Sequence, residues 1–291
     1  MPDRSPHRGY GTVFNRVATS YDRHRPAYPE GLIDRAFVVA GLRPGDKVLE
    51  IGCGTGQLTR ALLARGLRVT AIEPGERLVA LARQNLAGSG EVRFLTARLE
   101  DAPLPREHFA AVFSASAIHW VDPDVAWQRS AEVLVLGGTL ALVQYFGVHD
   151  PYSAEDQRAL LSAMSAIAPE IAANWPSYRN LETTLAGVYE RRENISAVWA
   201  WLGSCDVARA CAAGLFGEAE IAAVPMSIEH TAEELNSLVG TLSFWSRLSP
   251  AQRTALQGEN RALHERLGRP IRSSTVACLV TATSNLSQAR S

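Results

Sequence analysis

Short apolar runs alternate with amphipathic segments between positions 47 and 146, and this alternation constrains the fold more than any other feature. It is typical of parallel strands that are joined by crossover helices. The runs are almost continuously apolar, as in strands that helices cover on both faces. They comprise residues 47–51, 68–73, 91–95, 109–116 and 139–146. The pattern predicts an α/β fold with a mostly parallel sheet.

Two further runs, 220–230 and 274–283, bring the predicted sheet to seven strands. Pro225 favours an edge position or a bulge for the first of them, because proline cannot donate a hydrogen bond to a neighbouring strand. Thr231 and Glu234 have the spacing of a capping box at a helix start. We expect an N-terminal helical arm or lid (1–28), a core (29–147), a helical cap inserted after the fifth strand that forms the substrate pocket (148–218), the completion of the core sheet (219–285) and a tail (286–291).

The charges of the chain are nearly balanced, with 29 basic and 30 acidic residues among 291. This balance argues against a nucleic-acid or membrane partner, since both require an excess of positive charge on one face. The four cysteines are too few for a disulfide scaffold, and neither a secretory signal nor a long apolar span is evident. We expect a cytoplasmic protein that acts on a small molecule and binds no metal, with homo-oligomerisation left open.

The segment from Val48 to Gly56 is an apolar strand that ends in glycines at alternate positions, directly before a helix. Glycine permits a tight turn and a close approach of a ligand, and a helix N-terminus presents unpaired N–H groups. A dinucleotide fingerprint would place its third glycine one residue later, where Gln57 stands. A phosphate-binding P-loop would require a lysine after the turn, and none follows.

The E-x-G-x-G-x-G pattern resembles motif I of the class I S-adenosylmethionine-dependent methyltransferases, of the small-molecule type that includes trans-aconitate and ubiquinone-pathway enzymes. The resemblance covers residues 10–146 and, more loosely, the last two strands. It implies a Rossmann-like fold and S-adenosyl-L-methionine as the cofactor, with S-adenosyl-L-homocysteine as its product and no metal. In that family the glycine loop wraps the methionine and ribose portion, a role that falls here to Gly52, Cys53, Gly54 and Gly56.

Further cofactor contacts follow from the same resemblance. Glu73 ends the second strand, followed by Pro74, and a carboxylate there can accept hydrogen bonds from both ribose hydroxyls. After the third strand the family places an acidic residue that binds the adenine amino group. The family has an aspartate where this chain has Arg98, so the role passes to Glu100, with Asp101 as the alternative.

The N-terminal segment is similar to the one that closes over the cofactor in small-molecule members of the family. Arg25 in this segment is either a surface cation or a partner of the cofactor's carboxylate. Tyr21 could reach the transferred methyl group with its hydroxyl. Ser114, at the end of the fourth strand, completes the expected cofactor contacts.

His119 and Trp120 follow the fourth strand at the carboxyl edge of the sheet, where ligands of open α/β folds bind. The Asn/Asp-Pro-Pro-Tyr-like tetrapeptide of nucleobase and protein-glutamine methyltransferases does not occur there. His119 is either a structural histidine or the general base for a hydroxyl or carboxylic acid acceptor. If the acceptor is an alkene carbon, the rings of Tyr21, Trp120, Trp199 and Trp201 could stabilise the carbocation or form an apolar pocket.

The acceptor atom, oxygen, nitrogen or carbon, stays open at this point. Lys47 is the only lysine among 29 basic residues, and this arginine-rich composition favours a bacterium of high genomic GC content. There, aromatic or terpenoid compounds of specialised metabolism are common substrates. A noncatalytic cofactor-binding protein and an NAD-dependent oxidoreductase remain the alternatives from other classes.

Overall fold

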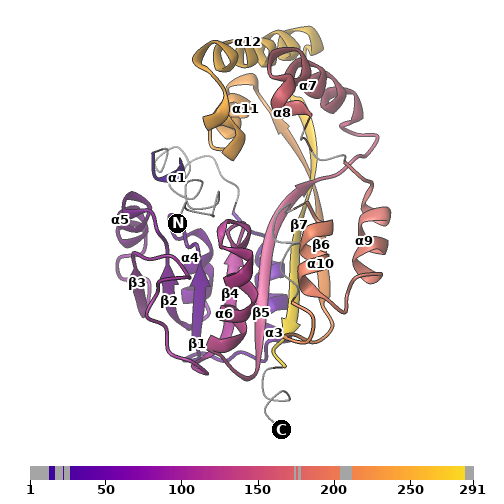
Figure 1. Ribbon diagram of the computed structural model, residues 1–291. Coiled ribbons are helices and arrows are strands. Elements are labelled where there is room, and N and C mark those ends of the chain that lie inside the picture. Colours follow the sequence, from indigo (N-terminus) through magenta and orange to yellow (C-terminus); the bar gives the residue numbers. More distant parts are fainter. Residues whose placement is uncertain are drawn as a thin grey trace, which may run out of the picture.

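The computed structural model describes residues 13–16, 22, 27–173, 175, 178–203 and 212–285. A seven-stranded sheet with the order β3-β2-β1-β4-β5-β7-β6 forms the centre of the molecule (Figure 1). Its strands are β1 (Lys47–Ile51), β2 (Arg68–Ile72), β3 (Val92–Leu95), β4 (Phe109–Ala115), β5 (Leu134–Gly147), β6 (Glu220–His230) and β7 (Ile271–Thr283).

The first five strands are parallel, and β7 runs antiparallel to both β5 and β6. This arrangement confirms the predicted Rossmann-like, mostly parallel sheet of seven strands. β6 lies at the edge, as Pro225 indicated. β5 and β7 are longer than expected, at 14 and 13 residues, and they carry the chain beyond the rest of the sheet.

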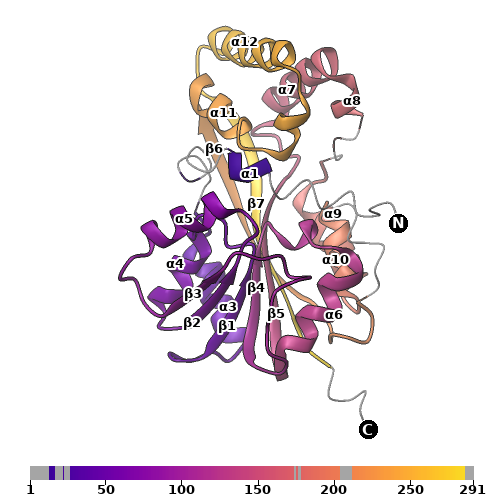
Figure 2. The ribbon, with the colours of Figure 1, turned by 60° about the vertical axis from the view of Figure 1, so that its left-hand side comes forward.

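Helices cover both faces of the sheet because successive strand residues point to opposite sides. Val48 packs with α3 (Glu30–Val39), α4 (Gln57–Ala64) and α5 (Glu76–Asn85) on one face. Leu49 belongs to the core of the other face, which three further helices cover (Figure 2). These are α6 (Pro123–Val133), α9 (Leu181–Tyr189) and α10 (Ile195–Trp201).

A cap stands on the extended ends of β5, β6 and β7 (Figure 1). It has apolar clusters of its own. The cap consists of α7 (Ala154–Ile167), α8 (Pro169–Ala172), α11 (Ala232–Val239), η4 (Ser243–Arg247) and α12 (Pro250–Leu267).

The expected cap, residues 148–218, is therefore divided in the structure. Its first part, α7 and α8, lies in the cap, whereas α9 and α10 pack on the sheet through Val188 and Trp199. Residues 219–285 do more than complete the sheet, because α11, η4 and α12 supply the other half of the cap. The division arises because β6 and β7 both extend into the cap and place the helices between them beside α7.

The cap is tied together by polar contacts at its helix starts and at β7. Thr231 and Glu234 form the predicted capping box of α11. Asp156 of α7 is buried and accepts from both terminal guanidinium nitrogens of Arg269, at 2.7 and 2.8 Å. The backbone N–H of Arg272 donates to the same carboxylate at 2.7 Å.

The short helix α1 (Val13–Arg16) contacts α5 of the core and η4 of the cap (Figure 2). Asn15 fixes it to α5, because its side-chain oxygen accepts from the backbone N–H of Arg77 at 2.8 Å. The described residues contain no helix with the length and apolar character needed to cross a membrane.

Candidate functional site

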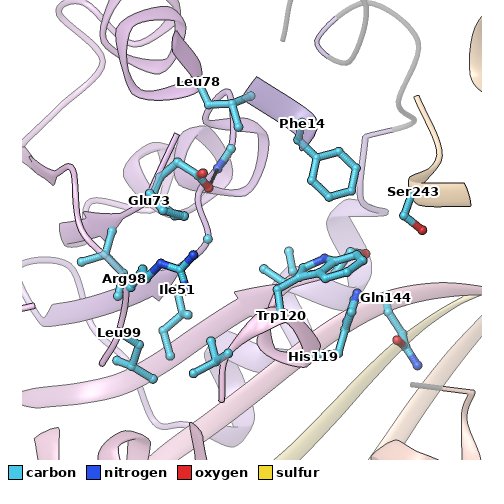
Figure 3. Close-up of a pocket in the computed structure, with 18 of the residues that line it drawn as sticks. Phe14, Ile51, Glu73, Leu78, Arg98, Leu99, His119, Trp120, Gln144 and Ser243 are labelled. Carbon is cyan, nitrogen blue, oxygen red and sulfur yellow. Dashed lines mark hydrogen bonds between the residues drawn. The ribbon is translucent and has the colours of Figure 1, made fainter. Parts of the chain in front are cut away.

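A cavity of about 270 Å³ opens at the carboxyl ends of the parallel strands, beneath the cap (Figure 3). The loops after β1, β2, β3 and β4 line it together with β5. Phe14 of α1 enters it from the N-terminal segment, and Leu242 and Ser243 enter it from the cap. The cavity therefore lies where ligands of open α/β folds bind.

The glycine turn after β1 forms one wall of the cavity. Gly52 has a φ of +72°, and a Cβ on it would collide with the side chain of Ala117 in the loop after β4. Only glycine allows these two loops to lie together at the cavity wall. Gly54 also lines the cavity, with a φ of +55°.

Gly56 and Cys53, which we expected to contact the cofactor, do not line this cavity. Gly56 precedes α4 and packs against α5, where a Cβ would lie 2.7 Å from Leu86 Cδ1. Cys53 lines a second cavity of about 20 Å³ behind the turn. Cys53 and Gly56 are not among the residues that line the main cavity, so their expected contact with the cofactor stays a prediction.

Glu73 lies at the end of β2, where the sequence predicted it, and its side chain lines the cavity. It is only 6% exposed, and its two oxygens accept from the backbone N–H of Gly75 at 2.9 Å and of Gly54 at 3.2 Å. Burial raises the pKa of the Glu73 carboxyl from 4.5 to about 6. Pro74 lines the cavity beside it.

Glu50 is a second buried carboxyl group, behind the turn at the second cavity. Its Oε2 accepts from Thr59 Oγ1 at 2.6 Å. Burial is the main cause that raises the pKa of Glu50 from 4.5 to about 7, and the nearby charge of Glu73 adds to it. Glu50 is the first residue of the E-x-G-x-G-x-G pattern, but the sequence did not indicate that its carboxyl group is buried.

The residues after β3 divide between the cavity and the surface. Glu100 lines the cavity, and its Oε1 accepts from the backbone N–H of Asp122 at 3.0 Å. Asp101 is exposed and is not among the lining residues. Arg98, which stands where the family has an aspartate, also lines the cavity (Figure 3).

Ser114 is buried inside β4 and does not reach the cavity. Its Oγ donates to the carbonyl of Ile51 at 3.0 Å, so it joins β4 to β1. The expected cofactor contact of Ser114 is wrong for this reason. Ser116, just beyond the strand, lines the cavity instead, with a φ of +51°. Its Oγ accepts from the hydroxyl of Tyr28 at 3.4 Å.

His119 and Trp120 lie in the short helix η2 (Ile118–Trp120), and both line the cavity. Their ring centroids are 4.8 Å apart. Phe14 meets the Trp120 ring in an edge-to-face arrangement with centroids 5.7 Å apart. The structure thus brings the predicted base and the predicted aromatic residue to the cavity that contains Glu73.

Trp199 and Trp201 lie away from the cavity, so their predicted contact with the substrate is wrong. Trp199 of α10 is fully buried in the core between helix and sheet. Trp201 lies against the guanidinium groups of Arg179 and Arg191, whose Cζ atoms are 3.7 and 4.2 Å from the ring centroid. Its Nε1 donates to the carbonyl of Thr184 at 2.9 Å.

Two predicted residues, Tyr21 and Arg25, lie outside the described residues. Phe14 belongs to the N-terminal segment that was expected to close over the cofactor, and it lines the cavity. Sequence reasoning missed Gln144 and Tyr145, which also line it. The polar Gln144 within the apolar run of β5 was a signal that could have been used. Within the described part of the chain, no group of three or more His, Cys, Asp or Glu side chains is arranged to hold a metal ion.

Residues 49–142 match the family model described as a methyltransferase domain. An uncharacterised methyltransferase of Mycobacterium tuberculosis is 38% identical over 136 residues, which cover 47% of this chain and 53% of that protein. The chain thus spans about half the length of this relative. The UbiE ubiquinone/menaquinone biosynthesis C-methyltransferase of Bordetella parapertussis is 28% identical over 194 residues, or 64% of this chain and 75% of that protein.

Solved structures share the fold at low sequence identity. The YcgJ protein of Bacillus subtilis aligns with a TM-score of 0.52 and 17% identity, over 88% of this chain and 99% of that one. A Haemonchus contortus phosphoethanolamine N-methyltransferase, solved with S-adenosylhomocysteine, aligns with a TM-score of 0.50 and 14% identity, over 98% of this chain and 61% of that one. The domain match over residues 49–142, the glycine turn and the strand order of the sheet together identify a methyltransferase domain with the class I, Rossmann-like fold in this chain.

Proposed function

We propose that the protein transfers a methyl group from S-adenosylmethionine to a small apolar or aromatic metabolite. One observation carries the proposal: a single cavity contains features suited to the cofactor and features suited to an acceptor. We assign Gly52, Gly54 and Glu73 to the first side, that of the cofactor, and His119 and Trp120 to the second, that of the acceptor. All five line the cavity, and Figure 3 draws Glu73 apart from His119 and Trp120.

The residues on the first side fit S-adenosylmethionine. Each oxygen of Glu73 accepts one backbone N–H, and an ionised carboxylate has further lone pairs for the two ribose hydroxyls. Leu78 and Leu99 supply apolar surface for an adenine ring. Lys47 is at the start of β1, at the opposite end of the strand from the turn, so no lysine faces the turn. A cofactor without phosphate fits this arrangement better than a dinucleotide.

When bound, S-adenosylmethionine would supply an electrophilic methyl group for an in-line displacement. The protein's task is to hold donor and acceptor in line and to exclude water. Phe14, Leu242 and Ser243 close the cavity from the N-terminal segment and the cap. Trp120 provides an apolar wall, and His119 accepts the proton of an oxygen or nitrogen acceptor.

The setting we propose is the cytoplasm of a bacterium, in specialised metabolism. The arginine-rich composition and the nearly balanced charge support it. The aromatic lining by Phe14, Trp120 and Tyr145 supports an apolar or aromatic acceptor. The alternative is a noncatalytic cofactor-binding protein. A measurement of methyl transfer distinguishes the two, because only an enzyme turns the cofactor over.

The test is methyl transfer with S-adenosylmethionine labelled in its methyl group and acceptor panels that carry hydroxyl, amine or alkene groups. With a hydroxyl acceptor, His119→Ala should lower the rate about 10²- to 10⁴-fold, the usual contribution of a general base. His108→Gln is the matched control, because His108 is exposed just before β4, at the end of the strand away from the cavity.

Two results would count against the proposal. An unchanged rate in His119→Ala would remove His119 as the base while leaving the methyltransferase activity in place. Cofactor binding without transfer to any member of the three panels would favour the noncatalytic alternative. In either case the control variant shows whether a histidine substitution alone disturbs the protein.

A further inference from the structure

Leu242 and Ser243 are the residues that the described part of the cap contributes to the cavity wall. Both lie outside residues 49–142, the part of the chain that matches the methyltransferase domain. Glu73 and Glu100, which we assign to the cofactor, lie inside that part and line the same cavity. Figure 3 draws Ser243 apart from Glu73. We therefore assign the contribution of the cap to the acceptor side of the cavity.

The backbone of this wall is fixed by hydrogen bonds within the cap. The N–H of Leu242 donates to the carbonyl of Val239, the last residue of α11, at 3.0 Å. The carbonyl of Leu242 accepts from the N–H of Trp245 in η4 at 3.1 Å. These two bonds hold the turn that carries Leu242 and Ser243 in place above the cavity.

An apolar cluster of the cap supports the wall from behind. Phe244, which follows Ser243 directly, is buried in this cluster together with Met164 of α7. The ring of Trp175 meets the Phe244 ring in an edge-to-face arrangement, with centroids 5.1 Å apart. Leu242 itself packs against the cluster. Because packed side chains yield little to added volume, a ligand that presses on Leu242 meets a firm boundary.

The cavity leaves little room for an acceptor. Its volume is about 270 Å³, whereas the pocket of a single drug-sized ligand usually has about 300–1,000 Å³. The proposed function requires this cavity to take the acceptor in addition to the cofactor. The positions of the walls on the acceptor side therefore decide which acceptors fit.

We propose that Leu242 and Ser243 set the size limit of the acceptor, so that the cavity takes flat acceptors of one or two fused rings and excludes larger ones. This inference rests on the proposed methyltransferase function and narrows its class of acceptor. The acceptor ring packs on Trp120, and its far edge meets Leu242. A leucine-to-alanine change among packed side chains can open space that binds a benzene ring. Leu242→Ala should therefore admit an acceptor with one more ring.

The experiment measures binding to the full chain saturated with S-adenosylhomocysteine. The probes are phenol, 2-naphthol and 2-anthrol, which carry the same hydroxyl group on one, two and three fused rings. Without a size limit, each added ring would bury more apolar surface and the affinity would rise along the series. With the limit, the wild type should bind 2-anthrol about tenfold more weakly than 2-naphthol, or weaker still.

The wild type alone can contradict the inference. An affinity that rises through 2-anthrol would show that Leu242 and Ser243 impose no size limit. Absence of binding for all three probes would show that the cavity does not take flat acceptors of this size. Either result would overturn the inference.

Two variants move the wall in opposite directions. Leu242→Ala should bind 2-anthrol at least as tightly as 2-naphthol and keep the wild-type affinity for S-adenosylhomocysteine. Ser243→Leu adds bulk to the wall, so it should bind 2-naphthol about tenfold more weakly than the wild type and still bind phenol. Leu267→Ala is the matched control, because Leu267 is a partly buried leucine of the cap that does not line the cavity. It should keep the wild-type order of affinities.

The outcomes separate this inference from the proposed function. Loss of S-adenosylhomocysteine binding by the wild type would remove the proposed function and the inference with it. Normal S-adenosylhomocysteine binding, with the wild-type order of affinities retained in both Leu242→Ala and Ser243→Leu, would overturn only the role of the cap residues.

Discussion

Glu50 provides a quantitative test of the physical account of the glycine turn. Its carboxyl group is buried, and the pKa rises from 4.5 to about 7 chiefly through desolvation. At a pH above both values this difference costs the folded state about 3 kcal/mol. Glu50→Gln removes the charge and retains an oxygen that can accept from Thr59 Oγ1. We therefore expect the variant to be more stable than the wild type at pH 8, by up to about 3 kcal/mol.

The sign of the pH dependence follows from the raised pKa. The contribution of Glu50 to stability is fully present below pH 4.5, where the carboxyl is protonated in both states, and it is lost as the pH rises to about 7. The free energy of unfolding of the wild type should therefore fall over this window relative to Glu50→Gln. Urea denaturation of both proteins at pH 4.5, 6 and 8 measures the difference.

Glu259→Gln is the control, because Glu259 is exposed on α12 in the cap and its replacement should change stability by less than about 0.5 kcal/mol. The same Glu50→Gln variant should bind S-adenosylmethionine about tenfold more weakly, since it removes a negative charge near a cationic cofactor. If the difference in free energy of unfolding between the wild type and Glu50→Gln stays constant from pH 4.5 to 8, the assignment of a buried, largely desolvated carboxyl at position 50 is refuted.

Two substitutions test the packing of the site and of the core. Gly52→Ala should weaken S-adenosylmethionine binding at least tenfold, because its Cβ displaces Ala117 from the cavity wall. Gly45→Ala is the control, since Gly45 also has a positive φ, +93°, but has open space around it. This variant has the same kind of backbone strain and should bind S-adenosylmethionine normally in the same calorimetric titration. Trp199→Ala should lower the free energy of unfolding by about 3–5 kcal/mol in urea denaturation. Trp199→Ala should leave the KM for the acceptor unchanged, whereas Trp120→Ala should raise that KM. A raised KM in Trp199→Ala would show that Trp199 contributes to the substrate site.

The sheet could be predicted from the sequence because its strands are short apolar runs with clear ends. The glycine turn and Glu73 were predictable for a related reason, since a turn directly after a buried strand lies at a known edge of a parallel sheet. Pro225 likewise favoured an edge position, because proline cannot donate a hydrogen bond to a neighbouring strand, and β6 lies at the edge.

The surroundings of single side chains were less predictable. An amphipathic helix shows that one face is buried, but not against which partner, so α9 and α10 could not be assigned to the sheet and Trp199 could not be separated from a substrate-binding residue. Ser114 and Ser116 differ only in that β4 ends between them at Ala115, and sequence patterns do not locate a strand end to one residue. Gln144 was missed because an apolar run predicts a buried strand without indicating which of its residues face a cavity.

Calorimetric titration of the protein with S-adenosylmethionine, S-adenosylhomocysteine and NAD tests the central claim most directly. We expect one site that binds both sulfur compounds and does not bind NAD, with the affinity for S-adenosylmethionine reduced at least tenfold in Gly52→Ala. Binding of NAD alone, or no binding of either sulfur compound, would contradict the account.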